Sequence, residues 1–392
     1  MYKRQGSPFI SFSTVFNNYF LPEELPDLMD TSLKEQEIFS VKKDDVFITR
    51  TSETVDALAM SCVAVKDYPK ATFSGFVKRL RPKTTGIVYS KYIAFFLRSK
   101  YFRKVLDCNT IMTLRASFNE DMFSFLYLYL PDYEEQVRIG DLLYKMEMKI
   151  RTNNKINDNL EQQAKLIYDY WFTQFDFPDE NGKPYCSSGG KMVWNEQLKR
   201  NIPENWNVVP LLKLVSWESN SQPPKSEFVY EPKEGYVRFI QNRDYDSDTH
   251  ITYIPRTKNL SIVDRFDILM DKYGDAGAVR YGIEGAFNVA LGKICVHNPN
   301  YREYIRSFLG SDGIYKFLHN SCMASTRASL SEANLAILNV VVPDEKIILD
   351  YENFLHKIRV SILKNKDETV ELINLRDWLL PMLMNGQATI AD

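Results

Sequence analysis

The chain has 392 residues, of which 44% are hydrophobic and 13% aromatic, and this composition excludes wholesale disorder. Five widely separated cysteines without a CxxC pair disfavour a disulfide framework or a zinc site and fit the reducing cytoplasm. The sequence has neither a long apolar run nor a charged-then-apolar leader, so membrane spanning and secretion are disfavoured. A formal net charge of −2 counts against nucleic-acid binding by the chain as a whole, so local charge clusters decide that question.

The two halves of the chain repeat each other in the register that aligns Tyr92 with Tyr304. In this register Arg115-Ala116-Ser117 matches Arg327-Ala328-Ser329 without any gap. Upstream the register shifts, and Phe9-Ile10-Ser11 resembles Phe239-Ile240-Gln241. A shared register over such a length predicts a tandem duplication whose loops diverged while the scaffold was kept. Further matches in the first register are Ile93 with Ile305, Phe96-Leu97 with Phe308-Leu309, Pro131 with Pro343, Leu143 with Leu355, and Leu160 with Leu372.

The first half carries a basic stretch after its apolar strand segment Asp45–Ile48. Between Lys78 and Arg115 there are ten Lys or Arg residues against one acid, Asp107, a net charge of +9, and aromatic residues lie among them. A solvated helix face would explain a shorter run, but this density predicts a surface that faces phosphates. The residues of this half that we expect to contact DNA are Lys78, Arg79, Arg81, Lys83, Arg115 and Ser117.

Each half ends in a segment with apolar residues alternately four and three positions apart, which predicts a long helix with a coiled-coil seam. Asp132 offers an N-cap for the first helix. Asn153 and Asn365 occupy the same seam position in the two helices, and a polar residue there can fix register and partner. We therefore expect the helices to pack on each other, antiparallel, whereas the alternative is two ordinary amphipathic helices on separate cores.

The second half holds two polar clusters next to its strand segments, and both are candidates for DNA contact. Gln241, Asn242 and Arg243 are good readers of base edges, although an exposed polar turn would also explain them. Lys272, Tyr273 and Arg280 surround a glycine-rich turn. Arg327 and Ser329 repeat the first triplet; they suit phosphate binding, and the alternative is a structural loop whose Arg pairs with a carboxylate.

No catalytic motif is found in the sequence. Asn298-Pro299-Asn300-Tyr301 lacks the second proline of an adenine-methyltransferase motif, and no glycine-rich cofactor loop precedes it. A GxxxxGK[ST] phosphate loop is absent, which disfavours ATP hydrolysis. The four histidines are scattered. We therefore predict a non-catalytic chain without cofactor or metal.

Several segments together resemble the specificity subunits of type I restriction–modification systems. They are the heptad segments after Pro131 and Pro343, the passage Tyr170-Trp171-Phe172 through Ile202-Pro203-Glu204-Asn205-Trp206, and the closing Leu379–Gly386. The resemblance implies two target recognition domains that each read half of a split site on double-stranded DNA. It also implies partners: two methyltransferase subunits that dock on the helices, and restriction subunits. The sequence departs from the family pattern in two places. Arg376 occupies a core-like position. The first half has no counterpart of Ile202–Leu211, which we interpret as a natural shortening or a missing beginning.

The predicted fold class is a mixed α/β (α+β) fold of two tandem target recognition domains joined by two long helices in an antiparallel coiled coil. A helix of about 40 residues spans roughly 60 Å, so such a pair would act as a ruler between two half-sites. A scaffold whose end domains bind protein, or an unrecognised nuclease, are the alternatives. The predicted boundaries are 1–132 for the first domain, 133–173 for the first helix, 174–202 for a connecting loop, 203–343 for the second domain, 344–386 for the second helix and 387–392 for a tail.

Overall fold

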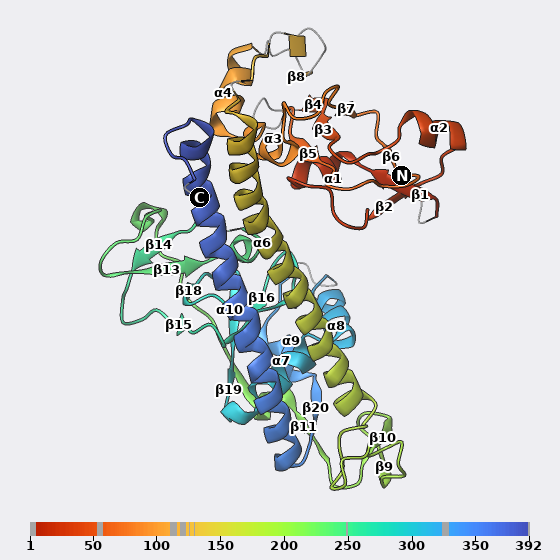
Figure 1. Ribbon diagram of the computed structural model, residues 1–392. Coiled ribbons are helices and arrows are strands. Elements are labelled where there is room, and N and C mark those ends of the chain that lie inside the picture. The colour runs from red at the N-terminus through yellow and green to blue at the C-terminus, as the bar shows by residue number, and fades with distance from the viewer. Residues whose placement is uncertain are drawn as a thin grey trace. The chain divides into compact units, whose positions relative to one another are not determined.

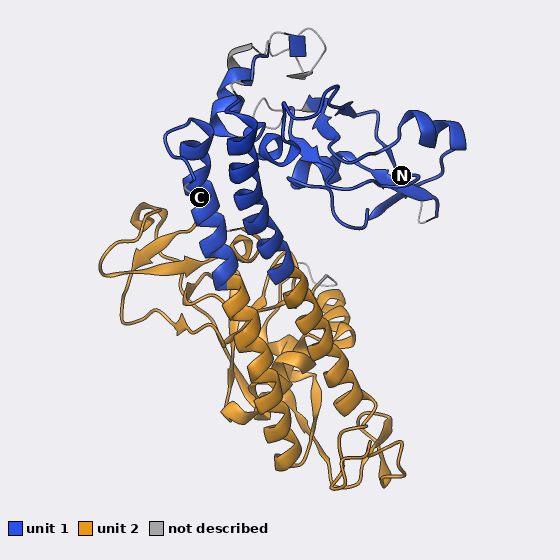
Figure 2. Ribbon diagram, viewed as in Figure 1, with its two compact units in different colours: residues 1–153, 367–392 blue, residues 154–366 orange. Residues whose placement is uncertain are grey.

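The computed structural model describes residues 5–52, 58–109, 116–117, 123–124, 126–128, 130–247, 250–323 and 329–390. The chain forms two compact units (Figure 2): unit 1 comprises Met1–Asn153 with Asp367–Asp392, and unit 2 comprises Asn154–Lys366. Both units mix helices with short strands, so the predicted mixed α/β fold is confirmed. Within the described ranges, no helix combines the length and the apolar character needed to cross a membrane.

Unit 1 is built on two three-stranded sheets, ordered β2-β1-β6 and β5-β3-β7 (Figure 1). Ser11 caps α1, since its hydroxyl accepts the Thr14 N–H, and a Ser32–Glu35 capping box begins α2. The elements of this unit, besides its parts of the long helices, are β1 (Ser7–Ile10), α1 (Phe12–Asn17), β2 (Asp27–Met29), α2 (Leu33–Ile38), β3 (Val46–Thr49), β4 (Thr51–Ser52), β5 (Ser61–Val63), β6 (Thr72–Phe73), β7 (Val77–Leu80), α3 (Ser90–Phe96), α4 (Lys100–Asn109) and β8 (Ala116–Ser117).

Unit 2 has two four-stranded sheets, ordered β12-β19-β16-β17 and β14-β13-β18-β15, and two smaller pairs, β10-β9 and β11-β20. Its elements, besides its parts of the long helices, are η2 (Asp169–Thr173), β9 (Met192–Asn195), β10 (Arg200–Pro203), β11 (Asn207–Pro210), η3 (Leu211–Lys213), β12 (Val215–Glu218), η4 (Lys225–Glu227), β13 (Tyr236–Ile240), η5 (Asn242–Tyr245), β14 (Tyr253–Pro255), β15 (Ile262–Val263), β16 (Ile268–Asp271), β17 (Val279–Arg280), β18 (Gly285–Phe287), β19 (Leu291–Val296), η6 (Pro299–Tyr301), α7 (Arg302–Leu309), α8 (Asp312–Met323), α9 (Glu332–Ala336) and β20 (Asn339–Val342).

The same topology occurs in both units. Strand β1 lies between an antiparallel and a parallel neighbour, and so does β13. Strands β3 and β16 each lie between two antiparallel neighbours. The helices keep the register of the sequence repeat, since α3, α4 and α6 begin at Ser90, Lys100 and Tyr133, and α7, α8 and α10 begin at the matching Arg302, Asp312 and Glu345. The duplication seen in the sequence is therefore a duplication of structure.

Two long helices, α6 (Tyr133–Tyr168) and α10 (Glu345–Met384), contribute to both units. Asp132 caps α6, because its carboxylate accepts the Glu135 N–H at 2.8 Å. In unit 1 the helices are joined by the Glu147–Arg376 ion pair (3.0 Å). Arg376 is thus accommodated in the seam by a carboxylate of the opposite helix, with its guanidinium 5.2 Å from the Tyr19 ring.

The polar seam residues show the direction of the helix pair. In unit 1 the Asn153 amide donates to Glu368 at 2.8 Å. In unit 2 Asn365 donates to the Asn157 carbonyl at 2.9 Å. Contacts that advance along α6 therefore move back along α10, so the helices pack antiparallel within each unit, as predicted. The apolar seam is buried too, at Ile139, Leu143, Ile150, Ala164, Leu355, Ile358 and Ile362.

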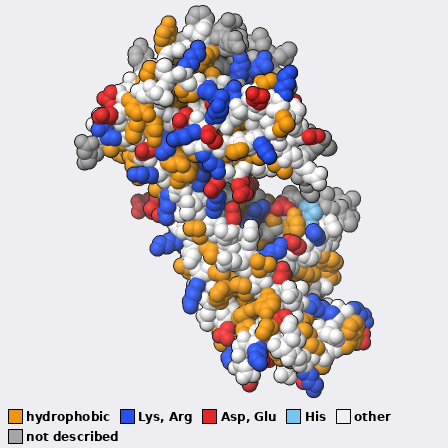
Figure 3. Space-filling model, turned by 45° about the vertical axis from the view of Figure 1, so that its right-hand side comes forward, with side chains coloured by type: hydrophobic (Ala, Val, Ile, Leu, Met, Phe, Trp, Pro, Cys, Tyr) orange, Lys and Arg blue, Asp and Glu red, His pale blue; other side chains and the backbone are white. Residues whose placement is uncertain are grey.

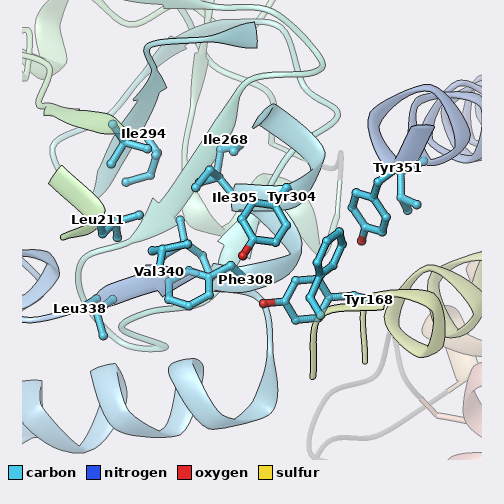
Figure 4. Packing of buried hydrophobic residues seen from close by; sticks show 14 of the residues in the cluster. Tyr168, Leu211, Ile268, Ile294, Tyr304, Ile305, Phe308, Leu338, Val340 and Tyr351 are labelled. Atoms are coloured by element: carbon cyan, nitrogen blue, oxygen red, sulfur yellow. The ribbon is translucent and has the colours of Figure 1, made fainter. Parts of the chain in front are cut away.

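The core of unit 2 joins the long helices to the sheet. Tyr168 of α6, Tyr304 of α7 and Tyr351 of α10 point toward one another beside sheet residues such as Ile268 (Figure 4). The Tyr351 hydroxyl donates to Ser307 at 2.8 Å, so this buried polar group is satisfied. Residues 174–202, expected as a connecting loop, contain the β9–β10 pair and bury two aromatic rings, Phe175 and Phe177, in this core.

Candidate nucleic-acid interface

In unit 2 an ion pair with a buried carboxylate joins the two ends of the glycine-rich turn between β16 and β17. Asp271, at the end of β16, is 1% exposed. Arg280 of β17 donates to its Oδ2 atom from Nη2 at 2.8 Å and from Nε at 3.2 Å. Burial raises the pKa of Asp271, and the hydrogen bonds from Arg280 and Asn242 oppose that rise. The Arg280 guanidinium, predicted as a DNA contact, therefore first serves to balance a buried charge.

The structure brings the second polar cluster to the same turn. Asn242 begins η5 directly after β13, and its side chain bonds Asp271. Gln241 donates its amide to the Thr252 hydroxyl at 3.1 Å. The side chain of Arg243 is 54% exposed, with Asp244 3.8 Å away and the His250 carbonyl at 3.4 Å. The two clusters, well separated in the sequence, are thus one site, and Arg243 is its most exposed cation.

Ser329, the last residue of the second Arg-Ala-Ser triplet, adjoins this turn as well. The Leu330 N–H donates to the Lys272 carbonyl at 2.9 Å, which brings the neighbouring Ser329 to the turn. Lys272 is half-buried, and burial lowers the pKa of its ammonium. Tyr273 beside it is 48% exposed. Arg327 lies outside the described residues.

In unit 1, Ser117 of the first triplet lies in the equivalent position. Ser117 of β8 pairs with Thr51 of β4, which follows the central strand β3 as the glycine turn follows β16. Arg115 lies outside the described residues. Arg50, an exposed residue, takes the place of Lys272, and our sequence reasoning missed it. Aligning Asp45 with Asp267 would have found it, because the same alignment places Arg50 opposite Lys272.

Several basic side chains of the unit 1 stretch are already bonded to other groups of the protein. Arg81 donates to the fully buried Asp45 at 2.6 Å and 2.7 Å. Arg79 donates to the Ser40 carbonyl and lies 5.5 Å from the Phe73 ring. Lys78 lies on β7 and is half-buried, whereas Lys83 is exposed beyond the strand. Of the four basic residues predicted here, Arg81 and Lys83 are exposed, and Arg81 already binds Asp45.

Two further cations of the stretch hold the fold together. Arg98 donates to the carbonyls of Val15, Phe16 and Asn18 at 2.7–2.9 Å, which satisfies the C-terminal end of α1. Lys91 pairs with Asp141 at 2.7 Å. On the face drawn in Figure 3, Lys and Arg side chains gather over unit 1 with acidic and apolar side chains between them. The net charge of the stretch therefore overstates the surface that is open to phosphates.

The described residues hold neither a cluster of metal ligands nor a disulfide. No group of three or more His, Cys, Asp or Glu side chains within them has the arrangement of a metal site. Cys62, Cys186, Cys295 and Cys322 are free thiols. Burial raises the pKa of the Cys62 thiol to about 12, the opposite of what a nucleophilic cysteine requires.

Comparison with known proteins agrees with this geometry. Residues 2–162 match the family described as "Type I restriction modification DNA specificity domain". The chain is 23% identical over 446 residues to the "Type I restriction enzyme HindI specificity subunit" of Haemophilus influenzae, covering 97% of this chain and 94% of that protein. The chain is thus similar to type I restriction specificity subunits, and its first 162 residues carry the match to the specificity-domain family.

A second relative and a solved structure extend the similarity. The "Type I restriction enzyme MjaIX specificity subunit" of Methanocaldococcus jannaschii is 23% identical over 351 residues, which cover 84% of this chain and 76% of that protein. The crystal structure of the type I restriction–modification S subunit from M. genitalium shares the fold, with a TM-score of 0.61, 13% identity, and coverage of 97% of this chain and 90% of that one. The predicted resemblance to type I restriction specificity subunits is confirmed by the family match and the two relatives, and the solved structure shows the same fold.

Proposed function

We propose that this chain recognises a bipartite site on double-stranded DNA, with one half-site for each unit, and that it does no chemistry itself. The observation that carries the proposal is that the serine of each Arg-Ala-Ser triplet lies beside the loop that follows the central strand. Ser117 pairs there in unit 1, and Ser329 adjoins the turn in unit 2. Arg and Ser are common ligands of phosphate, and phosphate contacts fix the register of a reader on the duplex.

The proposal divides the predicted contacts into three roles. Phosphate binding falls to Arg115, Ser117, Arg327 and Ser329, together with Lys78 and Lys83. Base reading falls to Gln241, Asn242, Arg243, Lys272 and Tyr273, which lie around one turn of unit 2. Arg79, Arg81 and Arg280 hold the strands and loops in place, because their guanidinium groups already bond protein acceptors.

The two long helices serve in this proposal as the spacer between the half-sites. Adding one heptad to both helices lengthens such a spacer by about 10 Å, or roughly 3 base pairs. The preferred distance between half-sites should increase accordingly while each half-site keeps its sequence. Methylome sequencing of cells carrying the lengthened chain would show this directly, and an unchanged spacing would contradict the ruler.

The chemistry belongs in this proposal to partner subunits. Two methyltransferase subunits would dock on the helix pair, supply S-adenosylmethionine binding and modify adenine, and restriction subunits would join them to cut DNA in the cytoplasm. The names of the relatives, specificity subunits of type I restriction enzymes, support this assignment.

Titration of labelled duplexes tests DNA reading. With the methyltransferase partner present, we expect tight binding of one bipartite duplex and a steep loss of affinity as salt rises, because phosphate contacts release counterions. A duplex with one half-site scrambled is the matched control. No binding to any duplex would favour a protein scaffold, and magnesium-dependent cleavage by the chain alone would favour a nuclease.

A further inference from the structure

Arg280 of unit 2 is bonded along one edge of its guanidinium group and open at the other end. Its Nε and Nη2 atoms both donate to Oδ2 of the buried Asp271, at 3.2 Å and 2.8 Å. Within the described part of the chain, Nη1 makes no hydrogen bond. The Arg280 side chain is 24% exposed. One end of a charged group with several donors is therefore left for a ligand.

Two further contacts restrain the same guanidinium. Its central carbon lies 5.6 Å from the centre of the Tyr245 ring. Asp275, in the glycine-rich turn, has a carboxylate oxygen 3.7 Å from Nη2 of Arg280. The Tyr315 hydroxyl donates to the other oxygen of that carboxylate, which holds the turn against α8. Because the rotamer of Arg280 is already fixed in the free protein, little conformational entropy remains to be lost when it binds.

The fold does not require a charged pair at this position, because unit 1 has a neutral one. Strand β17 pairs with β16 as β5 pairs with β3, and in these registers Cys62 is the counterpart of Arg280. Thr49, the last residue of β3, is the counterpart of Asp271, the last residue of β16. Both unit 1 side chains are buried, and the Thr49 hydroxyl accepts the Met60 N–H at 2.9 Å. Since a buried ion pair is seldom more stable than neutral residues in its place, the pair in unit 2 indicates a role beyond folding.

We propose that Arg280 reads a guanine in the half-site of unit 2, and that Asp271 is the positioning residue that orients its free end toward the base. Arginine donates two hydrogen bonds to O6 and N7 of guanine, which is the most common specific contact in the major groove. The free Nη1 and the second N–H of Nη2 supply such a pair of donors. The same turn carries the base-reading candidate Tyr273. This inference rests on the proposed function and gives Arg280 a second role besides holding the turn.

Transferring the neutral pair of unit 1, by Asp271→Thr with Arg280→Cys, tests the proposal without leaving a buried charge uncompensated. The full chain is titrated, with its methyltransferase partner, against the preferred duplex and a series with single base-pair changes. In the parent chain, replacing one G·C pair of the unit 2 half-site should weaken binding by about tenfold or more. In the double variant, all base pairs should bind equally at that position, while the preferences at every other position stay as in the parent.

The outcomes separate base reading from the other roles of an arginine. An equal loss of affinity for every duplex, with faster hydrogen exchange of β16 and β17, would show that the pair only holds the fold and would overturn the proposal. A reduced salt dependence would assign Arg280 to a phosphate and overturn it as well. So would a double variant that keeps every base preference of the parent.

Asp271→Asn tests the positioning role separately. The amide has one acceptor oxygen in place of two, and it carries no charge, so Arg280 stays present but is held less firmly. The guanine preference should become weaker without being abolished, and an unchanged preference would overturn the role of Asp271. A parent complex that prefers no duplex would instead overturn the proposed function, and this inference with it.

Discussion

Each unit packs its long helix across the start of a short helix, but the two joints use different polar groups. In unit 1, the Gln136 side chain of α6 accepts the Tyr89 N–H before α3 at 2.9 Å. In unit 2, Glu352 of α10 accepts the Glu303 N–H of α7 at 2.8 Å. Unit 1 has Gly140 at the position of Glu352, one helical turn after Gln136. Both units keep the same backbone arrangement at this contact. The N–H at the start of the short helix is bound by a neutral amide in unit 1 and by a carboxylate in unit 2.

This difference shows what a repeated scaffold must conserve. Apolar positions at the joint recur, since Tyr92 and Tyr304 are both buried, because they fill the same space between helix and sheet. Polar groups need only some partner, and any nearby side chain that supplies one suffices. The two units should therefore respond alike to loss of apolar packing and differently to loss of a polar or charged group.

The largest difference is expected at position 359 and its counterpart 147. Arg359, 5% exposed, donates to Glu303 at 3.0 Å and to Glu161. Arg359→Ala removes a positive charge that balances these two carboxylates. It should therefore lower the free energy of unfolding of unit 2 by about 3–5 kcal/mol. Urea unfolding followed by tryptophan fluorescence measures this, because four of the five tryptophans lie in unit 2.

Glu147→Ala in unit 1 is the matched change. It should cost only about 1–2 kcal/mol, because Arg376 keeps Asp377 at 2.9 Å and Arg151 keeps the Phe20 carbonyl at 2.6 Å. Amide hydrogen exchange in unit 1 measures this loss of stability. Equal losses at positions 147 and 359 would show that the two charge networks are equivalent after all.

Gly140→Ala should give the next largest effect, confined to unit 1. A Cβ at this position would lie 2.8 Å from the Tyr92 nitrogen and 2.9 Å from the Tyr89 ring. Overpacking of this kind costs about 1–3 kcal/mol, more than the helix propensity gained. Gly313→Ala in α8, where nothing lies within 4 Å of the added Cβ, is the control and should be neutral or stabilising. Hydrogen exchange of α3 amides distinguishes the two variants. Unchanged exchange in Gly140→Ala would mean that the contact between α6 and the start of α3 relaxes to accommodate the added methyl group.

Arg115→Ala and Arg327→Ala compare the two units as readers. If each arginine binds a phosphate, each substitution should weaken binding of every duplex by about tenfold, or 1.4 kcal/mol, and should reduce the salt dependence by about one counterion. Anisotropy titrations on the preferred duplex and on one with single base changes measure both effects. A change of base preference in either variant would assign that arginine to base reading instead.

The sequence predicts the helices and their seam well, because their signal is local. Apolar residues three and four apart, as at Ile139 and Leu143, can only be buried together on a helix. The partners of polar residues are not local. Asp45 and Arg81 are far apart in the sequence, and no periodicity links them, so the sequence does not show that Arg81, a predicted DNA contact, balances a buried carboxylate.

The seam asparagines illustrate the same limit. Their positions were predictable from the heptads, but the hydrogen bond that Asn365 donates to Asn157, at a different heptad position, was not. In an antiparallel pair, equivalent positions do not face each other unless they lie at the crossing point, and the sequence does not place that point. Arg50 was missed for a related reason, since loops of different length shift the register between the halves.

The smallest expected effect is a pH dependence carried by the carboxylate cap of unit 2. Burial, together with the nearby Glu303, raises the pKa of Glu352 from its ordinary value of 4.5 to about 7, although the Glu303 N–H bond and the cations of Arg302 and Arg306 oppose the rise. A carboxyl with a raised pKa in the folded state binds its proton more tightly there than in the unfolded chain. Its contribution to stability is therefore complete below about pH 4.5 and is lost as the pH rises through 7.

Glu352→Gln separates this contribution from all other titrating groups. The amide oxygen can still accept the Glu303 N–H but carries no charge at any pH, so the decline in unit 2 stability between about pH 5 and pH 8 should become shallower than in the parent chain. Gln136→Glu makes the reverse exchange in unit 1 and should introduce a decline there. Urea midpoints from tryptophan fluorescence at a series of pH values measure the first variant, and α3 amide exchange measures the second. Parallel pH profiles for the parent chain and Glu352→Gln would mean that the carboxylate stays charged in the joint, held by Arg302 and Arg306.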